Sequence, residues 1–312
     1  MNSSTGLVTC MGEILIDMVQ ETTGRELFEA HPGGAPANVA VGIARLGGKS
    51  AFMGKVGDDR LGKFLVETLK KNDVNIEGLK LGGRTGIALV SLAEDGERSF
   101  DFYEKLITYG ELDVDTQVLD HSEIFHFGSI SLIDKPQSLA TIKCLKASKE
   151  RKILISYDPN YRPNLWKSEN IAREGMRVGL KYADVLKVAK DEIEFLTSES
   201  DVERGIKKLY EENPDLKLIA VTLGAQGSYC WYQEKGKLIP TIKVSAVDTT
   251  GAGDGFMAGL LYSIQKKCGL ENMDWNSMEQ AFKFANIVGS ITTTQKGAIS
   301  ALPYMEQIKQ YI

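Results

Sequence analysis

The chain has 312 residues, of which 43% are hydrophobic and 25% charged, and it carries a net charge of −5. That is enough chain for a large buried core, and with no basic block we expect neither nucleic acid nor membrane as a partner. No apolar run is long enough to span a bilayer. The cysteines, which are far apart and form no CxxC pair, predict a reduced cytoplasmic protein without a zinc site: Cys10, Cys144, Cys230 and Cys268.

Short apolar runs typical of strands alternate with longer segments of helical period. The predicted strands are 7–19, 50–56, 123–130, 152–159, 183–189 and 216–224, and the helices between them include 38–47, 61–74, 138–150 and 171–183. This alternation predicts a three-layer α/β fold, a doubly wound and mostly parallel sheet covered by helices. Ligands of such sheets bind beyond the carboxyl ends of the strands.

Two segments interrupt the alternation. Residues 15–30 are polar and rich in turn formers, and 86–103 predict a hairpin around the turn EDGE. We therefore expect one domain, 1–312, with a small antiparallel β-sheet formed by about 15–32 and 86–106. Such a sheet could serve as a lid over the substrate or as a dimer surface.

The first candidate side chains lie near the N-terminus. Asp17, close to the end of the first predicted strand, is either an unpaired carboxylate or a hydroxyl-binding group, and we favour the second. The segment HPGGAPANVAVGIARLGG, 31–48, leads from paired glycines into a helix that carries Asn38 in its first turn. An amide there can donate to and accept from a hydroxyl, although an incidental Asn at a helix start explains the pattern equally well.

Further polar groups follow later predicted strands. In SYDPNYRPNLW, Asp158, Asn160 and Arg162 come where a strand ends, on the ligand side of the sheet.

In LKVAKDEIEFLT, Glu192 or Glu194 could order Mg²⁺ through water, while two exposed helical carboxylates are the alternative. In AVTLGAQGSYCWY, Thr222, Gly224 and Gly227 follow a strand and could line a nucleotide.

The segment DTTGAGDGFMAG, 248–259, leads into a helix expected from about Ala252 to Lys267. Its glycines let backbone N–H groups converge on an anion at the helix N-terminus, or they form a tight structural turn. There is no GxxxxGK[ST], and Phe256 breaks a GxGxxG dinucleotide fingerprint. Asp254 is either a helix-start carboxylate or a base that accepts a proton from a substrate hydroxyl.

Together these segments resemble the ribokinase-like (pfkB) family of ATP-dependent carbohydrate kinases. GGAPANVAVGIARLGG is similar to the N-terminal signature of the family and DTTGAGDGFMAG to its C-terminal signature. Within the family, SYDPNYRPNLW, DVLKVAKDEIEFLT and TTTQKGAISALP are most similar to fructokinases.

The resemblance implies a role for each matching residue. Asp254 would be the general base, with an anion hole formed by Gly251, Ala252 and Gly253. The sugar would be held by Asp17, Gly34, Asn38, Asn160 and Arg162. ATP would lie along Lys187, Thr222, Gly224, Gly227 and Asn286, with Glu192 ordering Mg²⁺ through water.

The resemblance also implies a β-sheet lid, a homodimer that pairs through its lids, and in many members a monovalent cation such as K⁺. Asp248 and Thr250 match part of that cation site, whereas Ala301 stands where a Ser often helps. A departure from fructokinases lies at 103–110, where Glu104 replaces an Arg and the loop is shorter. Either the substrate differs, or the sequence omits part of a mobile loop.

The resulting hypothesis is an ATP-dependent kinase that phosphorylates D-fructose at its 6-hydroxyl. The nearest alternative is a 2-keto-3-deoxygluconate kinase of the same family, whose acid substrate would call on Arg162, Lys105 and Tyr109. A non-catalytic sugar-binding protein is disfavoured by the intact GAGD sequence, and a dehydrogenase by Phe256.

Overall fold

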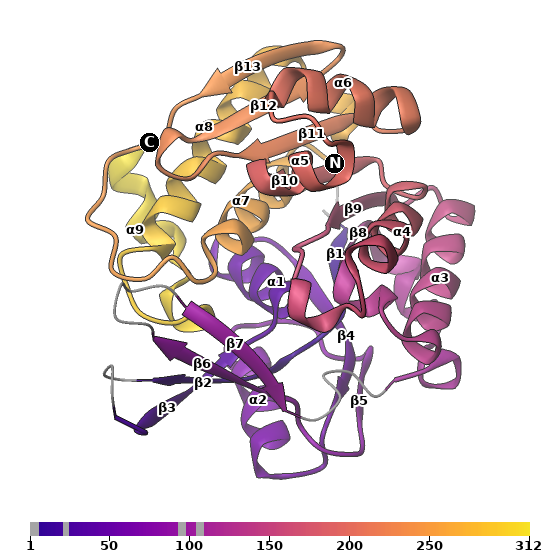
Figure 1. Ribbon diagram of the computed structural model, residues 1–312, viewed down its shortest axis with the longest axis vertical. Coiled ribbons are helices and arrows are strands. Elements are labelled where there is room, and N and C mark those ends of the chain that lie inside the picture. Colours follow the sequence, from indigo (N-terminus) through magenta and orange to yellow (C-terminus); the bar gives the residue numbers. More distant parts are fainter. Residues whose placement is uncertain (1–5, 21–24, 93–97, 104–108) are drawn as a thin grey trace, which may run out of the picture.

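A nine-stranded sheet forms the centre of the molecule (Figure 1). The computed structural model describes residues 6–20, 25–92, 98–103 and 109–312. The strand order is β13-β12-β11-β10-β9-β8-β1-β4-β5. All neighbours pair in parallel except β11–β12 and β12–β13, which are antiparallel. The predicted doubly wound α/β fold is confirmed.

The elements of the central sheet and its helices have clear bounds. The strands are β1 (Leu7–Met11), β4 (Ser50–Val56), β5 (Leu79–Leu81), β8 (Ser122–Gly128), β9 (Leu154–Asp158), β10 (Val185–Ala189), β11 (Leu218–Thr222), β12 (Ser228–Tyr232) and β13 (Lys235–Ile239). The helices are α1 (Ala35–Arg45), α2 (Arg60–Lys71), α3 (Lys135–Glu150), α4 (Glu169–Leu180), α5 (Lys190–Thr197), α6 (Val202–Glu212), α7 (Ala252–Lys266), α8 (Trp275–Thr292) and α9 (Met305–Ile308).

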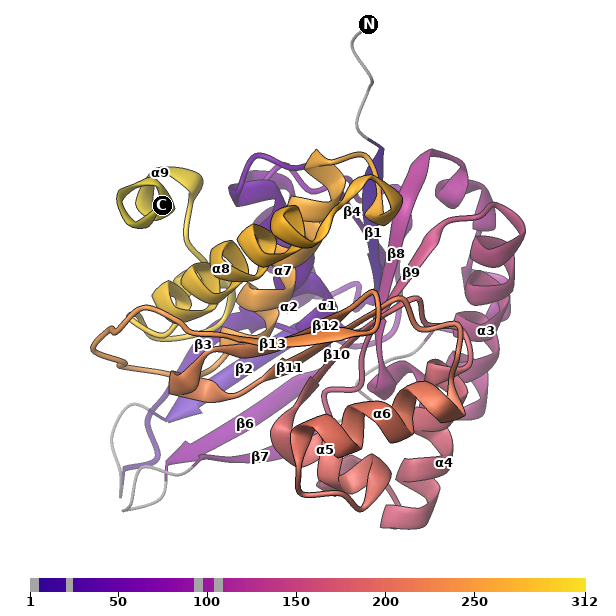
Figure 2. The same cartoon turned by 90° about the horizontal axis from the view of Figure 1, so that it is seen from above.

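Helices cover both faces of the central sheet (Figure 2). On one face α1, α7 and α8 pack against the strands, and on the other α3 to α6 do so. Alternate strand residues face opposite sides: Ile124 of β8 belongs to the core under α1 and α7, and its neighbour Phe125 to the core under α3 and α4. The sheet is thus buried on both faces, which accounts for its nearly continuous apolar runs.

The expectation of a single strand over 7–19 is wrong. β1 ends at Met11, and a separate strand, β2 (Leu15–Gln20), belongs to a second sheet. The break falls at Gly12, where an added Cβ would lie 2.6 Å from Cγ of Pro36 at the start of α1. Consequently Asp17 lies within the second sheet and not at the end of the first central strand.

The second sheet has the strand order β3-β2-β6-β7, with β3 (Phe28–Gly33), β6 (Ile87–Leu92) and β7 (Arg98–Tyr103) beside β2. The pairs β2–β3 and β6–β7 are antiparallel, as predicted, but β2 and β6 pair in parallel, so the sheet is mixed. Figure 1 shows it projecting from the central domain. The predicted turn EDGE and the departure at Glu104 fall outside the described residues.

Two expectations about chemistry can be compared with the fold. The four cysteines form no disulfide bond, and all are buried except Cys268, which is half-buried. In the part of the chain that the structure describes, no helix has the length and apolarity needed to cross a membrane.

Candidate active site

The N-terminus of α7 forms an uncapped, positively polarised turn. Gly251, its N-cap residue, has the left-handed φ of 76° and supplies no capping side chain. The N–H groups of a first helical turn have no acceptor within the helix, so they favour an anion. Gly253 is required here because an added Cβ would lie 2.9 Å from Nζ of Lys187. The turn and a cationic amine therefore face each other.

Asp254 lies in this first turn and is buried, with 8% of its surface exposed. Asn38 Nδ2, from the start of α1, donates a hydrogen bond of 2.7 Å to its Oδ2. Burial raises the pKa of Asp254 to about 6, against the lowering effect of this hydrogen bond. Gly251, and not Asp254, is the N-cap residue of α7, and Asp254 is an acidic residue of the first helical turn. At neutral pH it is an ionised acceptor at the positive end of a helix.

A buried ion pair lies beside the turn. Lys187, on β10, and Asp158, the last residue of β9, approach to 2.9 Å between Nζ and Oδ2. Burial acts to lower the pKa of Lys187, but the negative charges of Asp158 and Glu192 raise it above its ordinary value. Lys187 therefore stays protonated although it is almost inaccessible, and it adds a fixed positive charge next to Gly253.

Two cavities meet at the first turn of α7. One is lined by all five predicted sugar residues, namely Asp17, Gly34, Asn38, Asn160 and Arg162, together with Gly251 and Asp254. The other, of about 500 Å³, is lined by Ala252 and Gly253 and by the predicted nucleotide residues Thr222, Gly224, Gly227 and Asn286. That volume is typical of a small-molecule site. Consecutive residues of one turn thus face two different cavities.

The small sheet contributes to the first cavity. Leu15 and Asp17 of β2 and Phe102 of β7 line it. Asp17 can lie there because Gly33, on the paired strand, has no Cβ that would overlap with its carboxylate. The small sheet therefore forms part of the wall of this cavity, and its use as a lid over a substrate stays a prediction.

Not every predicted nucleotide residue lies on the larger cavity. Lys187 is absent from its lining and is buried beneath the turn. Asn286 lines the cavity, and its Nδ2 also donates to the carbonyl of Ile239 at 2.9 Å. It therefore fixes the cavity wall by tying α8 to the end of β13.

The predicted metal residue Glu192 is buried and fully engaged with the backbone. Its Oε1 accepts from the Tyr161 N–H and its Oε2 from the Ala189 N–H, both at 2.6 Å. Each carboxylate oxygen keeps a second lone pair, so Glu192 can still accept a hydrogen bond from a water. Among the described residues, no group of three or more acidic, His or Cys side chains is arranged to hold a metal directly.

Asp248 connects the turn before α7 to the chain after α8. Its Oδ1 accepts from the Thr250 N–H at 2.8 Å and its Oδ2 from the Gly297 N–H at 2.9 Å. Ala301 is buried in the short 3₁₀ segment that follows, Ile299–Ala301. The predicted cation residues Asp248 and Thr250 are thus next to the α7 turn.

Sequence reasoning missed Glu13, which also lines the first cavity. It is buried, with 4% of its surface exposed, and burial raises its pKa to about 7. The sequence did contain a signal, an acidic residue within the apolar run LVTCMGEILIDMV. Because the whole run was expected to be one strand, Glu13 was not considered as a site residue.

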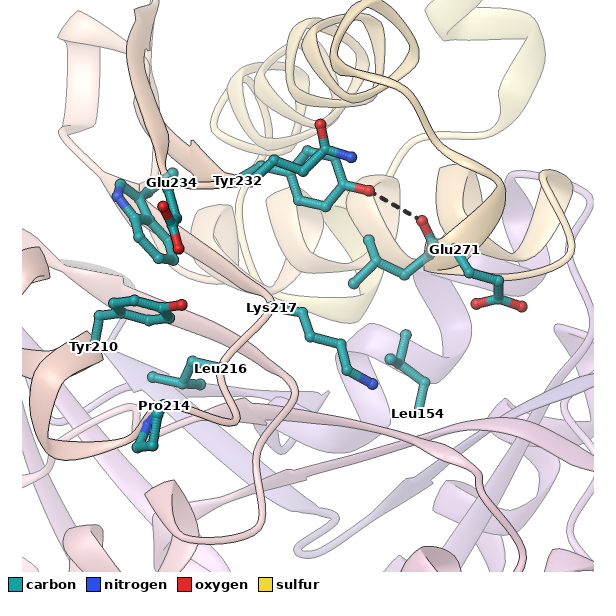
Figure 3. A pocket seen from close by; sticks show the side chains of 11 residues that line it. Leu154, Tyr210, Pro214, Leu216, Lys217, Tyr232, Glu234 and Glu271 are labelled. Carbon is teal, nitrogen blue, oxygen red and sulfur yellow. Dashed lines mark hydrogen bonds between the residues drawn. The ribbon is translucent and has the colours of Figure 1, made fainter.

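A third cavity, of about 420 Å³, lies at the amino ends of the parallel strands, away from α7. Figure 3 shows Tyr210, Tyr232 and Lys217 around it. It contains none of the predicted site residues, and the Lys217 ammonium already pairs with Asp184 at 3.1 Å. The predicted site residues gather instead at the carboxyl ends of the strands.

Comparison with known proteins agrees with this geometry. Residues 5–305 match the pfkB family of carbohydrate kinases. The chain is 44% identical to probable fructokinase-6, chloroplastic, of Arabidopsis thaliana (97% of this chain, 81% of the relative) and 44% identical to fructokinase-1 of Oryza sativa subsp. japonica (95% and 94%).

A solved structure has the same fold over the whole chain. It is a double-mutant fructokinase of Vibrio cholerae O395 with fructose, ADP and a potassium ion bound, and it aligns with a TM-score of 0.89 at 30% identity, covering 100% of this chain and 99% of the other. The chain therefore shares its fold with a solved fructokinase structure. The protein belongs to the pfkB family of carbohydrate kinases, and its predicted family is confirmed.

Proposed function

We propose that the protein is a fructokinase, which transfers the γ-phosphoryl group of ATP to the 6-hydroxyl of D-fructose. One observation carries the proposal: the first turn of α7 separates the cavity with the hydroxyl-binding side chains from the cavity of nucleotide size. A phosphoryl group on that turn could be reached from both sides. The fructokinase relatives support fructose as the acceptor.

Asp254 is the proposed base. Its ionised carboxylate accepts the proton of the 6-hydroxyl as the oxygen attacks the γ-phosphorus, the new O–P bond forms and the bond to the β,γ-bridging oxygen breaks, so that ADP leaves. Asn38 holds the carboxylate in place through the 2.7 Å hydrogen bond. Since the pKa is about 6, Asp254 is ionised at neutral pH and remains basic enough to share the proton.

The anion hole is proposed to be the N–H groups at 251–253, which face the charge that develops on the transferring group. Lys187, fixed by Asp158, adds a positive charge on the nucleotide side of this turn. Mg²⁺, ordered through water by Glu192, would neutralise charge on the β- and γ-phosphates when bound. Thr222, Gly224, Gly227 and Asn286 would hold the rest of ATP.

Fructose is favoured over a sugar acid by the charge of the first cavity. Glu13, Asp17 and Asp254 bring three carboxyl groups to its lining, against one guanidinium, that of Arg162. A neutral polyol can donate hydroxyls to such acceptors, whereas a substrate carboxylate would be repelled by them. Asp17, Gly34, Asn38, Asn160 and Arg162 are the proposed sugar contacts.

We also propose a monovalent cation, K⁺, near Asp248 and Thr250, beside the anion hole. Asp248 supplies negative charge in a loop whose backbone it already organises. Replacing K⁺ by Li⁺ or choline in the assay should lower kcat if this cation is used, and unchanged kcat would contradict its use.

The assembly and location of the enzyme are further proposals. We place it in the cytoplasm, where its four cysteines, which form no disulfide bond, would stay reduced, and we propose a homodimer that pairs through the lid sheet. Cell fractionation tests the first, and light scattering after gel filtration tests the second.

A substrate panel tests the proposed function. ADP release would be followed with fructose, 2-keto-3-deoxygluconate, ribose, glucose and adenosine at saturating MgATP. We expect kcat/KM on fructose to exceed the others by at least about tenfold. Preference for the keto acid would instead assign Arg162 as a carboxylate clamp and refute the fructose assignment.

A further inference from the structure

Glu13 occupies an unusual position, in the link between the two sheets. It lies between the end of β1 at Met11 and the start of β2 at Leu15. It is so close to the start of α1 that a Cβ on Gly34 would be 2.5 Å from its carbonyl oxygen. Its Oε1 accepts from the N–H of Ala35, the first residue of α1, at 3.0 Å. Its backbone and one side-chain oxygen are therefore fixed relative to the helix that carries Asn38.

The other oxygen of Glu13 has no partner. Oε2 is inaccessible and makes no hydrogen bond within the described residues, and the same holds for Oδ1 of Asn38. Both residues line the cavity that ends at Asp254. Leaving a buried acceptor unpaired is unfavourable, so two such acceptors in one cavity indicate that a ligand with hydroxyl donors completes them.

An unpaired oxygen alone does not mark a site, as Glu123 illustrates. Its Oε2 is also buried without a partner among the described residues. Glu123, however, lies at the amino end of β8 and is absent from the lining of the first cavity. What distinguishes Glu13 is its place on the cavity, together with its electrostatic contact with Asp254 and Arg162.

We propose that Glu13 is a further sugar-positioning residue of the fructokinase reaction, an inference that rests on the proposed function. Its Oε2 accepts a hydrogen bond from a fructose hydroxyl other than the one that is phosphorylated, while its Oε1 holds the start of α1 and hence Asn38. The reacting hydroxyl is left to Asp254. Glu13 thereby aligns the sugar with the base and selects against sugars that lack the contacted hydroxyl.

The test combines Glu13 variants with deoxy sugars, as in a double-mutant cycle in which one change is made in the protein and the other in the substrate. Glu13→Gln keeps an acceptor for the Ala35 N–H and Glu13→Ala removes it. Glu123→Gln is the control for a half-buried Glu whose Oε2 is also buried without a partner among the described residues. Each would be assayed for kcat and KM with fructose and with 1-, 3- and 4-deoxyfructose. Melting temperature and ATP affinity would report whether the variants are folded.

We expect wild type to lose about 10- to 100-fold in kcat/KM on one of the deoxy sugars, because that sugar would leave the buried Oε2 without a partner. Glu13→Ala should show that loss already on fructose, mainly through KM, and no further loss on that deoxy sugar. The kcat/KM of Glu13→Gln on fructose should lie between those of wild type and Glu13→Ala, and Glu123→Gln should match wild type on every sugar.

A purely structural role for Glu13 predicts a different pattern. The kcat/KM of the variants would then fall by the same factor on fructose and on every deoxy sugar. Such additive losses, with normal fructose turnover by wild type, would overturn the inference and leave the fructokinase function intact. Absence of fructose turnover by wild type would overturn both.

Discussion

Replacing Asp254 by Asn should make the protein more stable while it removes activity. The pKa of Asp254 is raised from 3.8 to about 6 by burial, so the folded state disfavours the ionised form. Above pH 6 the penalty is fully present, and it vanishes as the pH falls below about 4. The difference of about two pH units corresponds to ~3 kcal/mol. The amide carries no charge and can still accept from Asn38.

Melting curves of wild type and Asp254→Asn between pH 4 and 8 measure this penalty. We expect the variant to melt higher by about 5 °C at pH 8, with a gap that closes towards pH 4. Asp191→Asn is the matched control, because Asp191 also lies in the first turn of a helix, α5, but is exposed. An Asp254→Asn variant that melts at or below wild type at pH 8 would refute the reasoning.

Three other predictions concern the same turn. The kcat/KM for fructose should fall about tenfold per pH unit below a midpoint near pH 6. Asn38→Ala should move that midpoint up by about one pH unit, because it removes the hydrogen bond that stabilises the ionised Asp254. A midpoint that does not move would contradict this role of the Asn38–Asp254 hydrogen bond. Gly253→Ala should displace the Lys187 amine and lower kcat by about 10²-fold. The KM for fructose, which should not change, is the control. An unchanged kcat would exclude a close contact between the turn and the Lys187 amine during catalysis. Lys187→Met should lower the free energy of unfolding by about 3–5 kcal/mol, because it leaves Asp158 buried without its cation. Denaturant unfolding should show that adding Asp158→Asn restores part of this free energy. If the losses of the two substitutions simply add, the pairing of Lys187 and Asp158 is contradicted.

The regular elements of the fold could be predicted because their signals are local. The helix expected from Ala252 to Lys267 runs from Ala252 to Lys266, and the strand expected at 50–56 has those bounds. The helix combines a helical period with glycines before its start, and the strand is a short apolar run between glycine and polar residues, so both signals are local.

What the sequence could not predict depends on contacts between distant segments. The run 7–19 looks like one strand, and only the approach of Pro36 to Gly12 shows why the chain leaves the central sheet there. The same break places Glu13 on the cavity, which no local pattern indicates. The partners of Asp254 and Lys187, which are Asn38 and Asp158, are 216 and 29 residues away in the chain.

Candidate site residues were nevertheless found because their chemistry is concentrated at the ends of predicted strands and helices. Asn160 and Arg162 follow the carboxyl end of β9 and line the first cavity as expected. Their proposed contacts with the sugar, like those of the nucleotide residues, remain predictions.

The central claim is that the α7 turn carries the γ-phosphoryl group of ATP to the 6-hydroxyl of fructose with Asp254 as base. An assay that couples ATP and fructose to an isomerase and a dehydrogenase specific for 6-phosphates tests it most directly, with wild type, Asp254→Asn and Asp191→Asn side by side. We predict fructose 6-phosphate from wild type and Asp191→Asn, and a kcat lower by about 10²- to 10⁴-fold for Asp254→Asn with ATP affinity retained. No fructose 6-phosphate from wild type, or an Asp254→Asn variant within a few-fold of it, would contradict the claim.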